Sequence, residues 1–205
     1  MTYFTETKHA HRTDIEFDSK RFLGDITTAL GGATDIDPEY QGGRFNLGEL
    51  AIYIRAGYGA KARRVTISCG IADRAIHQLA YAQGRVGEFP SISIDPDRPL
   101  DAIVKDIRKR LIEAASEPLA QAKALAQKQA NTASELKAHA DRINSQFPGV
   151  VTLPDDNTKR EAALYMNGGG CYLSGRLNSD GGIYVDRLGS VPAHKVEALL
   201  KLLAE

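Results

Sequence analysis

The stretch from Leu50 to Ala72 contains two runs in which apolar and polar residues alternate, and a Gly-Tyr-Gly sequence separates the two runs. Side chains on a β-strand point alternately to opposite faces, so this pattern predicts two half-buried strands joined by a turn. The arms of the hairpin are expected at Phe45 to Ala56 and at Ala62 to Cys69. Because a helix has a different period, this stretch constrains the fold more than any other part of the chain.

The alternation also assigns the two faces of the first arm. Ile52 and Ile54 fall on one face, which is expected to enter the core. Tyr53 and Arg55 fall on the other face. The hairpin therefore predicts an antiparallel sheet with one buried face and one face that is aromatic and basic.

Residues 1–97 are expected to form an N-terminal α+β domain around this hairpin. Ser19 is a candidate cap for a helix with apolar residues at helical spacing, and Gly31-Gly32 is expected to end that helix. A loop that contains Asp37-Pro38 and Gly42-Gly43 follows. The other expected elements are a strand at Asp14 to Asp18, a short helix at Ala72 to Gln83 and a strand at Pro90 to Ile94.

Residues 98–147 have a helical pattern. Asp97-Arg98-Pro99 is a typical helix start, and apolar residues from Leu100 to Leu111 then recur at helical spacing. Ser116 and Pro118 predict the start of a second, Ala-rich helix. Polar residues interrupt its heptads, so both a long helix lying across a sheet and a coiled coil remain open.

Residues 148–205 predict a β-β-β-α module that packs on the long helix. The strands are expected at Ala162 to Met166, Cys171 to Leu177 and Ile183 to Leu188, and Gly-rich turns join them. Ser190 is a candidate cap for a terminal helix. The predicted fold class is therefore α+β, with an N-terminal antiparallel sheet and short helices, long central helices and this C-terminal module.

The composition limits the kind of partner that the chain can bind. The 205 residues include 26 basic and 26 acidic ones, which gives a formal net charge of zero. Hydrophobic residues make up 42% and charged residues 25%, as in a soluble globular protein. Binding to a polyanion must therefore depend on local clusters of charge. The lack of charge repulsion between copies also favours a homo-oligomer.

The expected location is the cytoplasm, and no membrane partner is expected. No apolar run approaches the roughly 20 residues of a membrane span, and the first residues lack the apolar region of a signal peptide. The two cysteines, Cys69 and Cys171, lie far apart in the sequence and are interpreted as free thiols in a reducing compartment.

The basic side of the hairpin is the leading candidate for a binding site. Glycines allow backbone amides to approach an anion, arginine and lysine neutralise phosphates, and tyrosines stack on bases. The candidate nucleic-acid-binding residues of the hairpin are Tyr53, Arg55, Tyr58, Lys61, Arg63 and Arg64. The same charges also suit a solvated hairpin whose edge resists aggregation, which requires no ligand.

A second basic cluster, formed by Lys105, Arg108, Lys109 and Arg110, is expected on the first long helix, and its first three residues are further candidates for binding nucleic acid. Acidic residues are interleaved with it, so the pattern also fits a solvated helix face. If both clusters face the same way, they form one larger nucleic-acid footprint.

The remaining histidine and cysteine motifs do not complete a site. His9 and His11 would share one strand face, where they either bind a metal or form polar surface, and no further ligands complete the metal set. Cys171 and His194 lack the spacing that is typical of a catalytic pair. Buried, inert thiols are therefore the favoured interpretation of the cysteines.

Two aspartate pairs and the absence of known motifs bear on catalysis. Asp35 with Asp37, and Asp95 with Asp97, lie beside prolines, and we expect them in turns where Asp caps backbone amides. The sequence contains no dinucleotide fingerprint, nucleophile elbow, Walker loop or zinc set. We therefore expect no cofactor and no metal, and the sequence identifies no enzyme active site.

The segment Ser91 to Leu111 resembles a stretch of uncharacterised proteins of bacteriophages and prophages, over a small part of the chain. The resemblance implies a phage or mobile-element origin and a bacterial host, and no activity. Separately, the order helix, three strands, helix in the last block is similar to a double-stranded-RNA-binding domain. Those domains have a Lys-rich start to the second helix, whereas this chain has Pro192-Ala193-His194-Lys195 there, so the similarity implies topology rather than RNA binding.

Three hypotheses for the function follow. The first is a non-enzymatic, phage-type cytoplasmic protein that binds nucleic acid through the basic hairpin. The second is a protein-binding inhibitor of a bacterial defence complex, which makes a host protein complex the partner. The third is an enzyme whose site has no recognisable motif.

Overall fold

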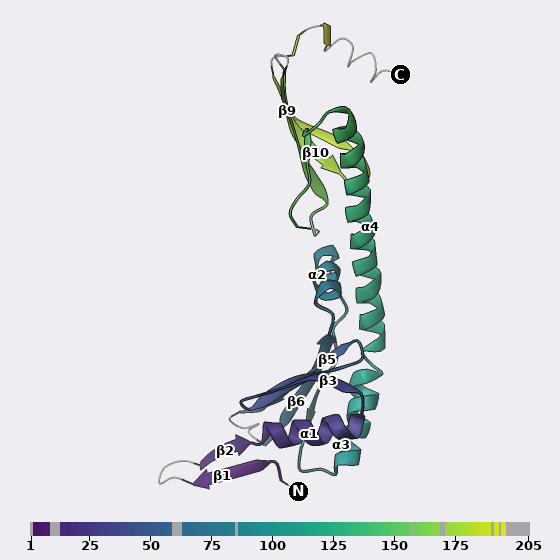
Figure 1. The fold of residues 1–205 in the computed structure, drawn as a ribbon. Coiled ribbons are helices and arrows are strands. Elements are labelled where there is room, and N and C mark those ends of the chain that lie inside the picture. Colours follow the sequence, from purple (N-terminus) through teal and green to yellow (C-terminus); the bar gives the residue numbers. More distant parts are fainter. Residues whose placement is uncertain are drawn as a thin grey trace. The chain divides into compact units, whose positions relative to one another are not determined.

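A computed structural model of the chain divides into two compact units, Met1–Ala124 and Leu125–Glu205. The residues that it describes are 2–8, 13–58, 63–84, 86–156, 158–168, 171–189, 191–192 and 194–195. Helices and antiparallel sheets occur together, which confirms the predicted α+β class (Figure 1). Among the described residues, no helix is both long and apolar enough to cross a membrane.

The first unit is built on a five-stranded antiparallel sheet. Each strand pairs with the next one along the chain, so the sheet is a simple meander. The strands are β3 (Ala33–Glu39), β4 (Gly42–Leu47), β5 (Leu50–Ala56), β6 (Val65–Ile71) and β7 (Ser91–Ile94).

The predicted hairpin corresponds to β5 and β6, which pair in register from Leu50 opposite Ile71 to Ala56 opposite Val65. The prediction of one continuous first arm from Phe45 to Ala56 is wrong, because a turn at Gly48 divides that stretch into β4 and β5. Gly48 has a φ of 59°, a conformation that glycine adopts without steric cost.

Helices cover one face of this sheet. Helix α1 (Ser19–Leu30) and helix α3 (Leu100–Ile107), which continues as a turn of π-helix (Arg108–Ile112), lie side by side (Figure 1). Their apolar sides and the inward-facing strand residues form one core, as the helical spacing predicts. Its fully buried side chains include Phe22, Ile26, Phe45, Ile52, Ile67, Ile103 and Ile107.

The predicted cap of α1 needs a correction of one residue. Asp18 is the N-cap, and its carboxylate accepts a hydrogen bond from the backbone N–H of Arg21. The hydroxyl of Ser19 instead donates to the backbone oxygen of Glu39, 2.7 Å away. The predicted end of the helix is confirmed, because Gly31 is the C-cap with a φ of 70°.

The expected loop around Asp37-Pro38 is largely strand β3, so the prediction that Asp35 and Asp37 lie in a turn is wrong. An irregularity in the register between Thr34 and Asp37 lets β3 accommodate a positive φ of 50° at Asp35. By contrast, Asp95 does cap a turn, since its carboxylate accepts a hydrogen bond from the backbone N–H of Asp97.

Two smaller elements complete the first unit. Strands β1 (Phe4–Lys8) and β2 (Thr13–Phe17) form a separate two-stranded sheet, whose Phe4 and Phe17 belong to the same core. Helix α2 (Arg74–Gln83) follows β6, and the carboxylate of Asp73 caps its N-terminus.

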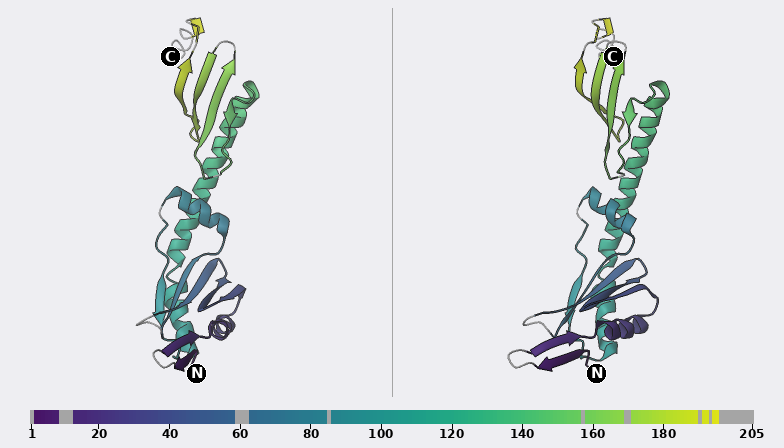
Figure 2. Two further views of the ribbon diagram at one scale, coloured as in Figure 1. Left: turned by 90° about the vertical axis from the view of Figure 1, so that its left-hand side faces the viewer. Right: turned by 60° about the vertical axis from the view of Figure 1, so that its left-hand side comes forward.

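The second unit combines a four-stranded sheet with part of the long helix α4 (Ser116–Gln146), within which the boundary between the units falls. The strand order is β11-β10-β9-β8, and Figure 2 shows these green-to-yellow strands side by side. The bounds are Val151–Thr152 for β8, Glu161–Gly168 for β9, Cys171–Asn178 for β10 and Ile183–Gly189 for β11.

The three predicted C-terminal strands are thus confirmed as β9, β10 and β11. Leu136 and Ala140 of α4 pack against Leu164 and Leu177 of the sheet. Most of the predicted helix after Ser190 lies outside the described residues.

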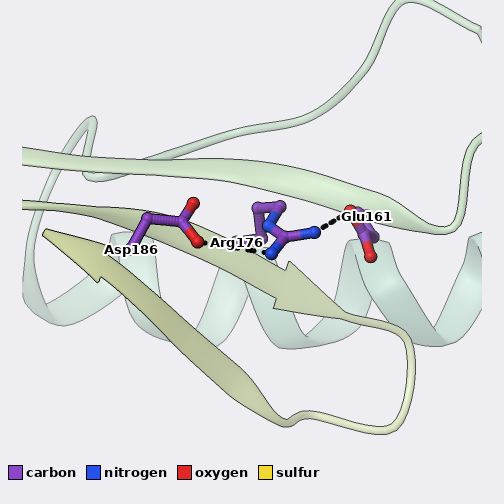
Figure 3. A network of polar contacts seen from close by, with 3 residues as sticks. All are labelled: Glu161, Arg176 and Asp186. Carbon is purple, nitrogen blue, oxygen red and sulfur yellow. Dashed lines mark hydrogen bonds and ion pairs between the residues drawn. The ribbon is translucent and has the colours of Figure 1, made fainter.

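On the solvent side of this sheet, Arg176 of β10 joins its two neighbouring strands (Figure 3). Its guanidinium lies 3.3 Å from Glu161 of β9 and 3.2 Å from Asp186 of β11. All three side chains are about half exposed, so we expect each ion pair to contribute little to stability.

Candidate nucleic-acid interface

The two faces of β5 are assigned as the sequence predicts. Ile52 is fully buried and Ile54 is 4% exposed, whereas Tyr53 is 44% exposed and Arg55 is exposed. The face that carries Tyr53 and Arg55 is turned away from α1 and α3, and we call it the outer face of the sheet.

Neighbouring strands add two arginines to the outer face. Arg44 of β4 lies directly opposite Tyr53 in the register. Arg64, the residue before β6, donates hydrogen bonds from Nε and Nη2 to the side-chain and backbone oxygens of Ser93 on β7, both at 3.1 Å. The outer face therefore has three arginines: Arg44 and Arg55 are neighbours of the half-exposed Tyr53, and Arg64 lies further along the sheet, opposite Gly57.

The three arginines differ in how far their charge is already compensated. Arg44 is paired with Asp37 of the edge strand β3 at 3.3 Å, and Arg64 is held by neutral oxygens of Ser93. Arg55 has no ion-pair partner within the part of the chain that the structure describes. Arg55 is therefore the cation on this face that is most available to an anionic ligand.

Two further candidates lie at the end of the sheet where β5 finishes. Tyr58 is 89% exposed, whereas Arg63 forms an ion pair with Glu6 of β1, so its charge is shared with a carboxylate. Lys61 lies outside the described residues.

The sequence analysis missed Tyr40, which is 85% exposed in the turn between β3 and β4. This turn adjoins the end of β5, because the N–H of Ala56 donates to the backbone oxygen of Gln41 at 2.8 Å. The signal that could have found Tyr40 is a lone tyrosine before Gly42-Gly43. Its position beside β5 depends on the strand register.

The second basic cluster lies on the opposite side of the first unit. Ile103 and Ile107 direct the buried side of α3 into the core, and Lys105 and Lys109 are exposed on its other side. The core therefore separates these lysines from the outer face, and the two clusters do not form one surface.

Arg108 has a structural role in this cluster. Its Nη2 donates to the backbone oxygen of Leu30, the last residue of α1, at 3.3 Å. A cation at this position satisfies a free carbonyl and opposes the negative end of the helix dipole. The groove beside it, of about 600 Å³, is lined by both Lys105 and Glu113, so its charge is mixed.

Two groups with raised pKa values bear on the hypothesis of an enzyme. Burial raises the pKa of the Cys69 thiol to about 11. Burial, followed by a 2.7 Å hydrogen bond to Asp25, raises the pKa of Tyr3 to about 12. Both shifts keep the group protonated at neutral pH, the reverse of what a nucleophile or a general base requires.

The metal and thiol motifs gain no support. His9 and His11 lie outside the described residues, as does the side chain of Cys171. Among the residues that are described, no group of three or more histidine, cysteine, aspartate or glutamate side chains is arranged to hold a metal ion.

The chain matches no protein-family model, no curated protein and no solved structure. The resemblance of Ser91 to Leu111 to phage proteins therefore stays a prediction.

Proposed function

We propose that the chain is a non-enzymatic protein that binds single-stranded nucleic acid on the outer face of the five-stranded sheet. The observation that supports this proposal most is the pairing on β5 of a half-exposed tyrosine, Tyr53, with an exposed arginine, Arg55, that has no ion-pair partner among the described residues. Arg44 and Arg64 on the adjacent strands extend the positive charge to either side.

This combination suits a single strand for two physical reasons. A single strand exposes the faces of its bases, and a tyrosine on an open sheet stacks on them. Arginines beside it neutralise the backbone phosphates. Because the formal net charge of the chain is zero, the attraction is local, and Asp37 of β3 weakens it near Arg44 through their ion pair.

The test is a salt titration of binding to a fluorescent single-stranded oligonucleotide, followed by anisotropy. Arg55→Glu is the informative variant, because no described ion pair depends on Arg55. We expect affinity to fall about tenfold or more, and the salt slope to decrease by about 0.7 for each phosphate that is no longer neutralised. Arg63→Glu and Arg64→Glu are less informative, since they also break the interactions with Glu6 and Ser93.

Lys109→Glu is the matched control, because it makes the same change of charge on the opposite side of the core. We expect it to leave affinity within about twofold, because Lys109 is too far away to contact the same strand. Equal losses of affinity in Arg55→Glu and Lys109→Glu would place binding elsewhere. Absence of binding at low salt to both DNA and RNA would refute the proposal and leave a protein partner, such as a host defence complex, as the hypothesis to pursue.

A further inference from the structure

The outer face ends in a hollow beside helix α2. The hollow has a volume of about 480 Å³, within the range of small-molecule sites. Tyr53 of β5 and Gly70 of β6 line one side of it, and His77 and Tyr81 of α2 line another. The segment from Val86 to Phe89 closes the remainder.

The hollow is rich in aromatic rings. His77 and Tyr81, one helical turn apart, have ring centroids 4.5 Å from each other and planes inclined by 37°. Tyr81 is 50% exposed, although a tyrosine that served only the core would be buried. Tyr53 contributes a third ring, from the strand.

The glycine at position 70 is a second, independent observation, because neither the backbone conformation nor close packing requires a glycine there. Its φ lies outside the left-handed region, so the backbone does not require glycine. A Cβ at this position would meet only Cε2 of Tyr53 within 4 Å, at an ordinary contact distance of 3.6 Å. Glycine in a strand interior weakens the strand, and here its effect is to keep the hollow open beside Tyr53.

We infer that this hollow receives one unstacked nucleobase of a bound single strand. The inference rests on the proposed function, because Arg55 and Arg64 would hold the backbone of the same strand. Stacking on tyrosine and histidine is the usual way in which a splayed base is held. Glu88, which also lines the hollow, is a hydrogen-bond acceptor that suits the exocyclic amino group of cytosine or adenine.

The test uses an oligonucleotide of about 12 nucleotides, a length typical of single-strand sites, with one 2-aminopurine at its centre. The chain contains no tryptophan, so the fluorescence of 2-aminopurine can be observed separately. We expect saturable quenching with the wild type. Gly70→Val occupies the space beside the Tyr53 ring with a residue that strands favour, and we expect it to abolish the quenching and to lower affinity about tenfold.

Thr152→Val is the matched control, since it places the same side chain at an exposed position of another strand, β8, which does not belong to the five-stranded sheet. It should leave the quenching unchanged. If Gly70→Val does not fold, as judged by circular dichroism, Tyr81→Ala on the exposed side of α2 replaces it with the same expectation.

An oligonucleotide with an abasic site at the same position completes the experiment. The wild type should bind it about tenfold more weakly, and Gly70→Val should not distinguish it from the intact strand. Unchanged affinity and quenching in Gly70→Val would overturn the inference while the proposed function stands. Absence of any strand binding overturns both. If free cytidine monophosphate or adenosine monophosphate binds as tightly as the strand, the hollow is a site for a free nucleotide, and the inference that it receives a base of a bound strand is overturned.

Discussion

Two adjacent residues of β5 test whether the inward face of the sheet determines stability while the outer face determines the proposed binding. Ile52 is fully buried, and Tyr53 next to it is 44% exposed on the outer face. Replacing a fully buried isoleucine by alanine typically costs about 3 kcal/mol, the sum of lost transfer free energy and the cavity left behind. With a urea slope of about 2 kcal/mol per molar, Ile52→Ala should lower the unfolding midpoint by about 1.5 M.

Tyr53→Ala should have the opposite effect, with a small loss of stability and a large loss of affinity for a single strand. Its side chain is 44% exposed and does not belong to the core cluster, so the expected loss of stability is about 1 kcal/mol or less. Loss of one stacked base should instead lower the affinity for a single strand about tenfold. Urea unfolding followed by circular dichroism measures the first effect, and anisotropy under native conditions measures the second.

The comparison is informative because the two substitutions are neighbours in sequence. The reasoning is refuted if both variants lose the same stability, since alternation would then not describe β5. It is also refuted if the folded Ile52→Ala protein loses as much affinity as Tyr53→Ala. In that case binding would depend on the integrity of the sheet rather than on the outer face.

Three further results are expected. Burial and the hydrogen bond to a carboxylate raise the pKa of Tyr3 from 10.0 to about 12. As the pH rises between these values, the unfolded chain loses the Tyr3 proton before the folded chain does, so the free energy of unfolding falls. A pH series of urea midpoints should show a smaller fall for Tyr3→Phe than for the wild type. In a Cys171→Ser background, iodoacetamide at pH 8 should alkylate Cys69 much more slowly in the folded than in the unfolded protein, because burial raises the pKa of its thiol to about 11. Equal alkylation rates in the two states would contradict the burial of Cys69. Gly175→Ala should lower the free energy of unfolding by about 2 kcal/mol, since the new Cβ would overlap a backbone oxygen of β11. Gly24→Ala, with open space around the new Cβ, should leave the free energy of unfolding unchanged or raise it in the same urea denaturation assay.

Local patterns explain which parts of the fold the sequence predicts. The alternation at Ile52 and Tyr53 and the Gly31-Gly32 helix end depend on neighbouring residues alone, so the faces of β5 and the end of α1 were predicted correctly. Strand β3 was missed because Pro38 and two aspartates are typical of turns, and pairing with β4 overrides that preference.

The candidate site is harder to predict because it depends on register and on layers. Arg44 joins Tyr53 only through the pairing of β4 with β5, which the turn at Gly48 shifts away from the expected single arm. The position of Tyr81 beside Tyr53 likewise requires α2 to fold back towards β6. The period of one segment does not contain this information.

The one-sided core of the first unit has a consequence for how its sequence can vary. Outward positions such as Tyr53, Arg55 and Thr66 lie on the opposite face from the inward isoleucines, so we expect their exchange to have little effect on the core. Stability is therefore determined mainly by the inward set of alternate residues, whereas the proposed binding of a single strand would depend on the outward set. A combinatorial library restricted to the outer set should retain folded members at high frequency, which makes this sheet a scaffold on which new specificities can be selected.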